Sequence, residues 1–238
     1  MDRARAARHL ARLAAVAVAL AVPCPAADPV RLPPPGRDGW KPLTLPKVAR
    51  RTTYTALDQD GHSVVRADSD CAASALALPL DGVDVTATPR LHWRWMVERG
   101  LTVANERVKA GDDFAARVYV LFRFDGRHAS LPARVRHRIA ALLFGADVPG
   151  HAINYVRSSA EPAGRTWDNP FASESKMISL GPAVPGAWTA EAVDVVADYR
   201  RLVGGDPPPL MALAVMTDSD NTCQRAVAYF ADFELSGP

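Results

Sequence analysis

Short runs of alternating apolar and polar residues, separated by turn-forming residues, recur from about residue 40 to the end of the chain. A strand places successive side chains on opposite faces, so runs of this kind are typical of strands, and their regular punctuation is typical of an all-β sandwich. Asp58-Gln59-Asp60-Gly61 is one such turn, since its glycine tolerates the positive φ of a tight hairpin. The predicted strands are Thr52–Leu57, Ser63–Ala67, Ser74–Pro79, Arg90–Val97, Ala115–Phe124, Ala152–Val156, Lys176–Leu180, Trp188–Val195, Leu210–Thr217 and Ala226–Glu234. We therefore expect a mostly β, jelly-roll-type antiparallel sandwich.

Two segments interrupt this pattern and predict short helices inserted in the sandwich. Ser130 to Phe144 begins with a serine cap, carries apolar residues on one stripe, and is followed by Gly145. A shorter helix is predicted at Ala197–Val203, because the glycines and prolines that follow it cannot extend a helix.

The N-terminus has the features of a secretory signal. Four arginines within the first twelve residues precede Leu13–Val22, which consists only of Leu, Ala and Val. This run is shorter than the roughly 20 residues that a membrane-spanning helix needs. The small residues of Cys24–Ala27 then offer a cleavage site. We predict a signal peptide at 1–27, a Pro-rich linker at 28–38 and one domain at 39–238, in the periplasm or secreted and not embedded in a membrane.

Charge and cysteine content narrow the possible partners and cofactors. The chain has 28 Lys+Arg and 26 Asp+Glu, a balance that gives no electrostatic footprint for nucleic acid. Without the signal, Cys71 and Cys223 remain, and in an oxidising compartment two thiols in one domain favour a disulfide. Two buried, unpaired thiols are the alternative. Cysteines and histidines show no zinc-site spacing, so no such metal site is predicted.

From Trp40 onward the chain resembles the bacterial family known as domain of unknown function 3047. The resemblance rests on the blocks Gly39-Trp40-Lys41-Pro42-Leu43, Trp93-Arg94-Trp95, Lys109–Val120, Met216–Thr222 and Ala228–Asp232. It implies a β-sandwich of exported proteins for which no activity is settled. The chain departs from the family pattern at Cys71 and Cys223, which favours a disulfide particular to this protein. A weaker likeness to galactose-binding-like jelly rolls and carbohydrate-binding modules rests on Tyr229–Leu235, and it is an analogy of fold.

Strand alternation predicts a polar sheet face. In Ala115–Phe124, the valines and phenylalanines share one face, and Arg117 and Tyr119 share the other. Arginine suits carboxylates or phosphates, and aromatic rings suit sugars. The predicted ligand-binding residues are Arg94, Arg117, Tyr119, Asn154 and Lys176. In the alternative interpretation, Arg94 and Arg117 form structural ion pairs with Asp112, Asp113 or Asp218.

Carboxylates gather in two places that could support chemistry. Asp113 with Asp218 or Asp220 is a candidate acid/base pair for a glycosidase or lyase. The same oxygens could hold a structural Ca²⁺, although Asp218–Thr222 has Cys223 where a calcium loop has glycine. Asp, Asn and Thr also build tight turns by bonding their own backbone, and we favour a turn without a cofactor.

Three hypotheses of function follow from these features. The leading one is a non-catalytic periplasmic binding protein that recognises a saccharide or an acidic small molecule. The second is a hydrolase or lyase that acts on envelope polysaccharide through the paired aspartates. The third is a structural or interaction protein. The sequence predicts no oligomeric state.

Overall fold

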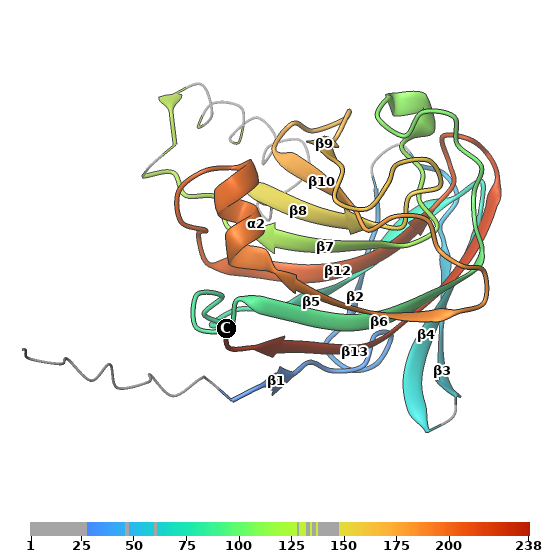
Figure 1. The fold of residues 1–238 in the computed structure, drawn as a ribbon, viewed down its shortest axis with the longest axis horizontal. Coiled ribbons are helices and arrows are strands. Elements are labelled where there is room, and N and C mark those ends of the chain that lie inside the picture. Colours follow the sequence, from blue (N-terminus) through green and yellow to red (C-terminus); the bar gives the residue numbers. More distant parts are fainter. Residues whose placement is uncertain are drawn as a thin grey trace, which may run out of the picture.

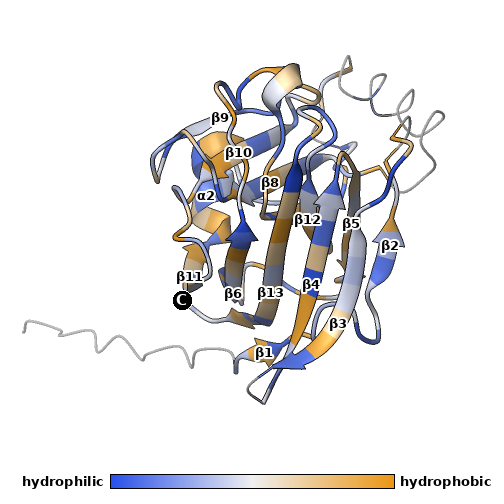
Figure 2. Cartoon of the chain, turned by 90° about the vertical axis from the view of Figure 1, so that its right-hand side faces the viewer, coloured by the Kyte–Doolittle hydropathy of each residue, from blue (hydrophilic) through white to orange (hydrophobic). Residues whose placement is uncertain are grey.

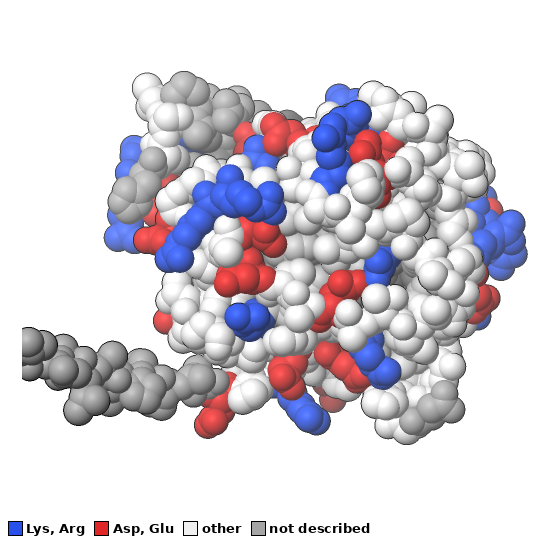
Figure 3. Space-filling view, viewed as in Figure 1, with Lys and Arg blue, Asp and Glu red and all other residues white. Residues whose placement is uncertain are grey.

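A computed structural model describes residues 28–238 except 46, 47, 60, 128, 132, 133, 135, 136 and 138–147. Two β-sheets pack face to face, so the predicted mostly β, jelly-roll-type sandwich is confirmed (Figure 1). Acidic and basic side chains are interspersed over the face seen in Figure 3, as expected from the near balance of charge. No helix in the described part of the chain is long and apolar enough to cross a bilayer.

Sheet A, as we name it, holds five strands side by side, and a short sixth strand pairs with the middle one. Their order is β11 (Trp188–Asp194), β6 (Arg90–Arg99), β13 (Arg225–Ser236), β4 (His62–Asp70) and β3 (Thr53–Gln59), with β1 (Val30–Arg31) beside β13. All of these pairs are antiparallel. β13 contains a bulge between its pairings at Ala231 and Glu234.

Sheet B has seven strands. Their order is β2 (Lys41–Leu43), β5 (Ala73–Pro79), β12 (Leu210–Asp218), β7 (Arg117–Phe122), β8 (His151–Val156), β10 (Ser175–Ser179) and β9 (Thr166–Asp168). Every pair is antiparallel except β8 with β10, which is parallel and needs the long connection between them. A short 3-10 helix, Lys109–Gly111, precedes β7.

The ten predicted strands correspond to β3–β8 and β10–β13. The sequence analysis missed β1, β2 and β9, which have only two or three residues each. β1 lies in the segment predicted as a linker and pairs with the end of β13. The second predicted helix is α2 (Val195–Leu202), which begins earlier because Asp194 caps it by accepting from the amide of Ala197 at 2.8 Å. The first, Ser130–Phe144, falls mostly outside the described residues.

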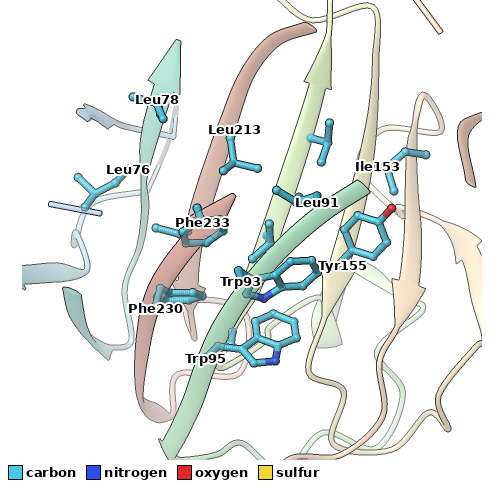
Figure 4. Packing of buried hydrophobic residues seen from close by; sticks show 14 of the residues in the cluster. Leu76, Leu78, Leu91, Trp93, Trp95, Ile153, Tyr155, Leu213, Phe230 and Phe233 are labelled. Carbon is cyan, nitrogen blue, oxygen red and sulfur yellow. The ribbon is translucent and has the colours of Figure 1, made fainter. Parts of the chain in front are cut away.

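The core between the sheets is built around large aromatic side chains (Figure 4). Trp93 and Trp95 are each 1% exposed, and their ring centroids lie 5.2 Å apart in an edge-to-face arrangement. Trp93 also stacks nearly parallel on Phe233, with the centroids 6.4 Å apart. Burying one such side chain contributes roughly 1.5–3 kcal/mol, so these inward faces hold the two sheets together.

A disulfide joins the turn after β4 to the turn before β13. Cys71 and Cys223 have Cα atoms 4.0 Å apart and are separated by 152 residues in the chain. Of the two alternatives for these cysteines, the structure therefore has the paired one. The backbone amide of Cys71 also donates to the carbonyl of Gln224 at 2.9 Å, which fixes the same two turns against each other.

Candidate functional site

Arg117, at the start of β7, is sealed inside the protein and only 2% exposed. Its Nε donates to Asp218 Oδ1 at 2.7 Å, and its Nη2 donates to Asp218 Oδ2 at 2.5 Å. Nη2 also donates to the carbonyl of Asp112, and Nη1 donates to Tyr119 Oη at 3.1 Å. The alternation of β7 was predicted correctly, since Arg117 and Tyr119 do lie on the face away from the core. The expectation that this face is open was wrong for Arg117.

Connecting segments cover this outer face of sheet B. The Phe114 ring lies against the guanidinium of Arg117, with 4.4 Å between Cζ and the ring centroid. Phe114 also packs with Trp167 from β9. At the other end of the face, Leu45 and Val48 pack beside Tyr119. Arg117 on this face therefore bonds to neighbouring protein groups rather than to solvent.

The five predicted ligand-binding residues do not converge. Asn154, on β8, is fully buried, with its Nδ2 3.1 Å from Met177 Sδ. Lys176, on β10, pairs with Asp168 at 2.6 Å. Arg94 lies on the other sheet, on β6, and its Nε donates to Asp232 Oδ2 at 2.6 Å. The ion-pair alternative describes Arg117 well, whereas Arg94 pairs with an aspartate that the sequence analysis did not name.

The three candidate catalytic aspartates do lie together. Asp113, Asp218 and Asp220 each bring one carboxylate oxygen within 4.8 Å of the others. Asp113 is fully buried and accepts four hydrogen bonds, from the amide and Nδ2 of Asn221 and from the amide and Oγ1 of Thr222, at 2.6 to 3.1 Å. These bonds fasten the turn between β12 and β13 to the segment before β7. The carboxylate oxygens are thus used in building a turn.

Electrostatics in this cluster depend on one cation. Burial raises the pKa of the Asp218 carboxyl, and the Arg117 guanidinium opposes that rise. Burial also raises the pKa values of Asp112 and Asp220. For Arg117, burial alone would lower the pKa, but Asp112 and Asp218 raise it well above its ordinary value. Arg117 therefore stays charged and balances part of the negative charge of Asp112 and Asp218.

The open sheet face belongs to sheet A. In Figure 2 its strands lie in front of the molecule, and hydrophobic and hydrophilic residues alternate along them. Trp188 on β11 and Tyr229 on β13 face each other there, with ring centroids 6.3 Å apart. Arg94 Cζ lies 5.2 Å from the centroid of Trp188, and Arg66 Cζ lies 5.5 Å from that of Tyr229. Met96 packs in the same cluster.

Paired charges surround these rings. Tyr229 Oη donates to Glu98 Oε2 at 2.6 Å and accepts from Arg66 Nη1 at 2.6 Å. Arg66 Nε also donates to Asp68 Oδ2 at 2.7 Å. Burial, and then the bond to Glu98, raise the pKa of Tyr229, so its hydroxyl keeps its proton. The side chain of Glu98 is 45% exposed, so the polar rim reaches water. We call Trp188, Tyr229, Arg66, Arg94 and Glu98 the sheet-A platform.

Comparison with known proteins places the chain in a family. A model of proteins of unknown function (DUF3047) matches residues 38–234. The chain belongs to this family. No curated protein matches the DUF3047 chain by sequence.

Solved structures with a similar fold include carbohydrate-binding modules and an endoglucanase. The family 30 carbohydrate-binding module of a Clostridium thermocellum cellulosomal cellulase is 10% identical, with 88% of this chain and 97% of that chain covered and a TM-score of 0.47. The family 11 module of Lic26A-Cel5E from the same organism is 7% identical, with 86% and 91% covered and a TM-score of 0.44. Endoglucanase 3 of Trichoderma harzianum is 11% identical, with 85% and 92% covered and a TM-score of 0.41. At these identities the likeness of the DUF3047 protein to them concerns the fold alone.

Most of the platform was missed by sequence reasoning. Only Arg94 was among the predicted ligand-binding residues of this DUF3047 protein. Tyr229, Arg66 and Glu98 come from strands far apart in the chain, and their meeting depends on β13 lying between β4 and β6. Trp188 at the start of a predicted strand was the one further signal, and it was equally compatible with core packing.

Proposed function

We propose that this DUF3047 protein binds a neutral saccharide on the sheet-A platform and does not transform it. The proposal rests on one observation: the half-buried Trp188 ring, on the outer face of sheet A, packs beside the buried Tyr229 ring and is bordered by arginine–carboxylate pairs. The export predicted from the N-terminus is part of this proposal, since it would bring the platform to saccharides outside the cytoplasm.

The platform offers the two kinds of contact that a sugar needs. The half-buried Trp188 ring provides apolar surface for the C–H face of a pyranose, and the buried Tyr229 ring supports it from the side. Arg66 and Arg94 offer planar N–H forks, and Glu98 offers acceptor oxygens, which suit neighbouring sugar hydroxyls as donors and acceptors at once. Binding therefore needs no charge on the ligand.

The charge of the platform favours a neutral ligand over an acidic one. Two arginines, Arg66 and Arg94, are already paired with three carboxylates, those of Asp68, Glu98 and Asp232. An anionic ligand would have to displace these carboxylates and would be repelled by them. Of the two ligand classes predicted from the sequence, the site thus supports the saccharide.

The paired-aspartate hydrolase or lyase receives less support from the geometry. Asp113 and Asp218 are 0% and 2% exposed, and both accept several hydrogen bonds from neighbouring groups. A general acid and base must reach a bound substrate. The hydrogen bonds of these two residues give them a structural role instead.

Calorimetric titration of the full protein with neutral and uronic-acid oligosaccharides tests the proposal. We expect a neutral glycan to bind, and Trp188→Ala to weaken that binding by about tenfold or more, because a central aromatic contact carries much of an interface's energy. Phe171→Ala is the matched control, since Phe171 is an exposed aromatic residue, 57% accessible, outside the platform. Wild-type affinity in Trp188→Ala, or no binding by any neutral glycan, would refute the proposal.

A further inference from the structure

A cavity of about 1090 Å³ lies at the end of the sandwich where β8 begins and α2 ends. Figure 1 shows α2 at this end of the molecule, beside the ends of β7 and β8. The cavity shares no lining residue with the sheet-A platform. Its volume is slightly above the range of pockets that hold drug-sized ligands, roughly 300–1,000 Å³.

Rings and prolines form much of the wall. Phe124, Tyr199 and the run Pro207–Pro209 line the cavity. Tyr199 is held by an edge-to-face contact with Phe122, with 4.7 Å between ring centroids. Val203, at the end of α2, adds aliphatic surface. Flat, apolar and largely rigid walls of this kind favour planar ring systems, since such ligands lose little conformational entropy on binding.

One pair of polar side chains in the wall determines which polar group a bound ring system needs. His151 Nδ1 lies 3.1 Å from Tyr199 Oη, within hydrogen-bond distance. If Tyr199 donates this hydrogen bond, the free groups are the Nε2–H donor of His151 and a lone pair on the tyrosine oxygen. If His151 donates it, the free groups are the tyrosine O–H donor and the Nε2 lone pair of His151. Either tautomer therefore leaves one donor and one acceptor. Among the described residues, no further hydrogen bond to these atoms is present.

The protonation state of His151 fits this scheme. Burial lowers the pKa of His151, an effect that Glu174 opposes and Lys176 reinforces. The imidazole is therefore neutral at pH 7 and has one donor and one acceptor nitrogen.

We propose that this cavity binds a neutral hydroxylated aromatic molecule of two or more rings. Its hydroxyl group can donate or accept, so in either tautomer it can bond to the open position on Tyr199 Oη. Its rings pack against Phe124 and the prolines of Pro207–Pro209. A purely apolar ring system would leave the pair unsatisfied, and an ionised phenolate could not donate.

The probes are 2-naphthol and naphthalene, which differ by the hydroxyl alone, titrated calorimetrically into the full protein. We expect 2-naphthol to bind more tightly than naphthalene. Tyr199→Phe keeps the ring but removes the hydroxyl, and it should weaken 2-naphthol about threefold to tenfold, the effect of one hydrogen bond, while leaving naphthalene unchanged.

Ala172→Trp provides an independent variant, because Ala172 lines the cavity and is exposed, so a larger side chain can fill the space without disturbing the core. It should weaken both probes. Ala163→Trp, at an exposed position outside the cavity, is the control and should bind both as the wild type does. Trp188→Ala should leave 2-naphthol binding unchanged, since it alters only the sheet-A platform.

Three results would overturn the proposal. The first is that 2-naphthol does not bind the wild type up to its solubility limit. The second is that Ala172→Trp and Ala163→Trp bind it equally well. The third is that Tyr199→Phe weakens both probes to the same extent, which would mean that the hydroxyl of the ligand does not contact this pair.

Discussion

Arg117→Met tests the view that one buried guanidinium holds the acidic cluster together. Methionine keeps an unbranched side chain and its packing against Phe114, but it removes every donor. Asp218 then loses two hydrogen bonds, and the carbonyl of Asp112 and the hydroxyl of Tyr119 lose one each. Asp218, only 2% exposed, is left without a counter-ion.

Removing one partner of a buried ion pair destabilises a protein by about 3–5 kcal/mol. For a domain of this size, each kcal/mol lowers Tm by roughly 2–4 °C, so we expect a fall of roughly 6–20 °C at pH 7. The loss should shrink on acidification. Burial raises the folded-state pKa of Asp218, and removing Arg117 takes away the cation that opposes that rise. A carboxyl with a raised folded-state pKa contributes stability at low pH that is lost as the pH rises through that pKa.

Urea unfolding followed by circular dichroism at pH 7 and pH 4.5 measures both effects. Arg200→Met is the matched control, because Arg200 is 57% exposed and pairs with Asp206 at the surface, where such pairs contribute about 0–1 kcal/mol. The double variant Arg117→Met/Asp218→Asn should regain part of the loss, since it removes the uncompensated charge. If Arg117→Met is no less stable than Arg200→Met, or equally destabilised at both pH values, the reasoning is wrong.

Three other predictions concern the same end of the sandwich. Cys71→Ala/Cys223→Ala should lower the free energy of unfolding by roughly 3–5 kcal/mol, because the unfolded chain gains conformational entropy without the cross-link. The corresponding double glycine variant should be about 1 kcal/mol per site more stable than the alanine one, because both positions have φ of 51°; thermal unfolding compares them, and equal Tm values would contradict this. Asp113→Ala should cost about 3 kcal/mol and speed amide hydrogen exchange at Asn221 and Thr222, whereas unchanged exchange would show that their bonds to Asp113 do not fix the turn. Calcium or EDTA should shift Tm by less than about 1 °C if Arg117 supplies the balancing charge, and a larger shift would favour a bound cation.

The strands could be predicted because their signals are local. Alternation and turn residues are contained within each segment, and even the inward face of β7 was assigned correctly. β2 and β9 were missed because three residues are too few to show a period, and Pro42 within β2 is a residue that usually argues against a strand. β1 was also missed, because it has only two residues and lies within a proline-rich stretch.

The candidate site could not be predicted in the same way, because it depends on what lies above each sheet. Alternation places Arg117 away from the core, but it cannot show that Phe114 covers the guanidinium from outside. Nor can it show that Arg94 belongs to the other sheet from Arg117. Tyr229 and Glu98 are 131 residues apart in sequence, and only the strand order brings their oxygens together.

The order of strands also has a consequence for how the chain reaches its folded state. β12 and β13, last in chain order among the described strands, occupy the interior of the two sheets: β12 lies between β5 and β7, and β13 lies between β4 and β6. Until residues 210–236 have emerged during synthesis, each sheet consists of two separated halves with unpaired edges. A nascent chain therefore cannot close either layer early, and such open edges invite pairing with other chains. Closure of both sheets therefore waits for residues 210–236.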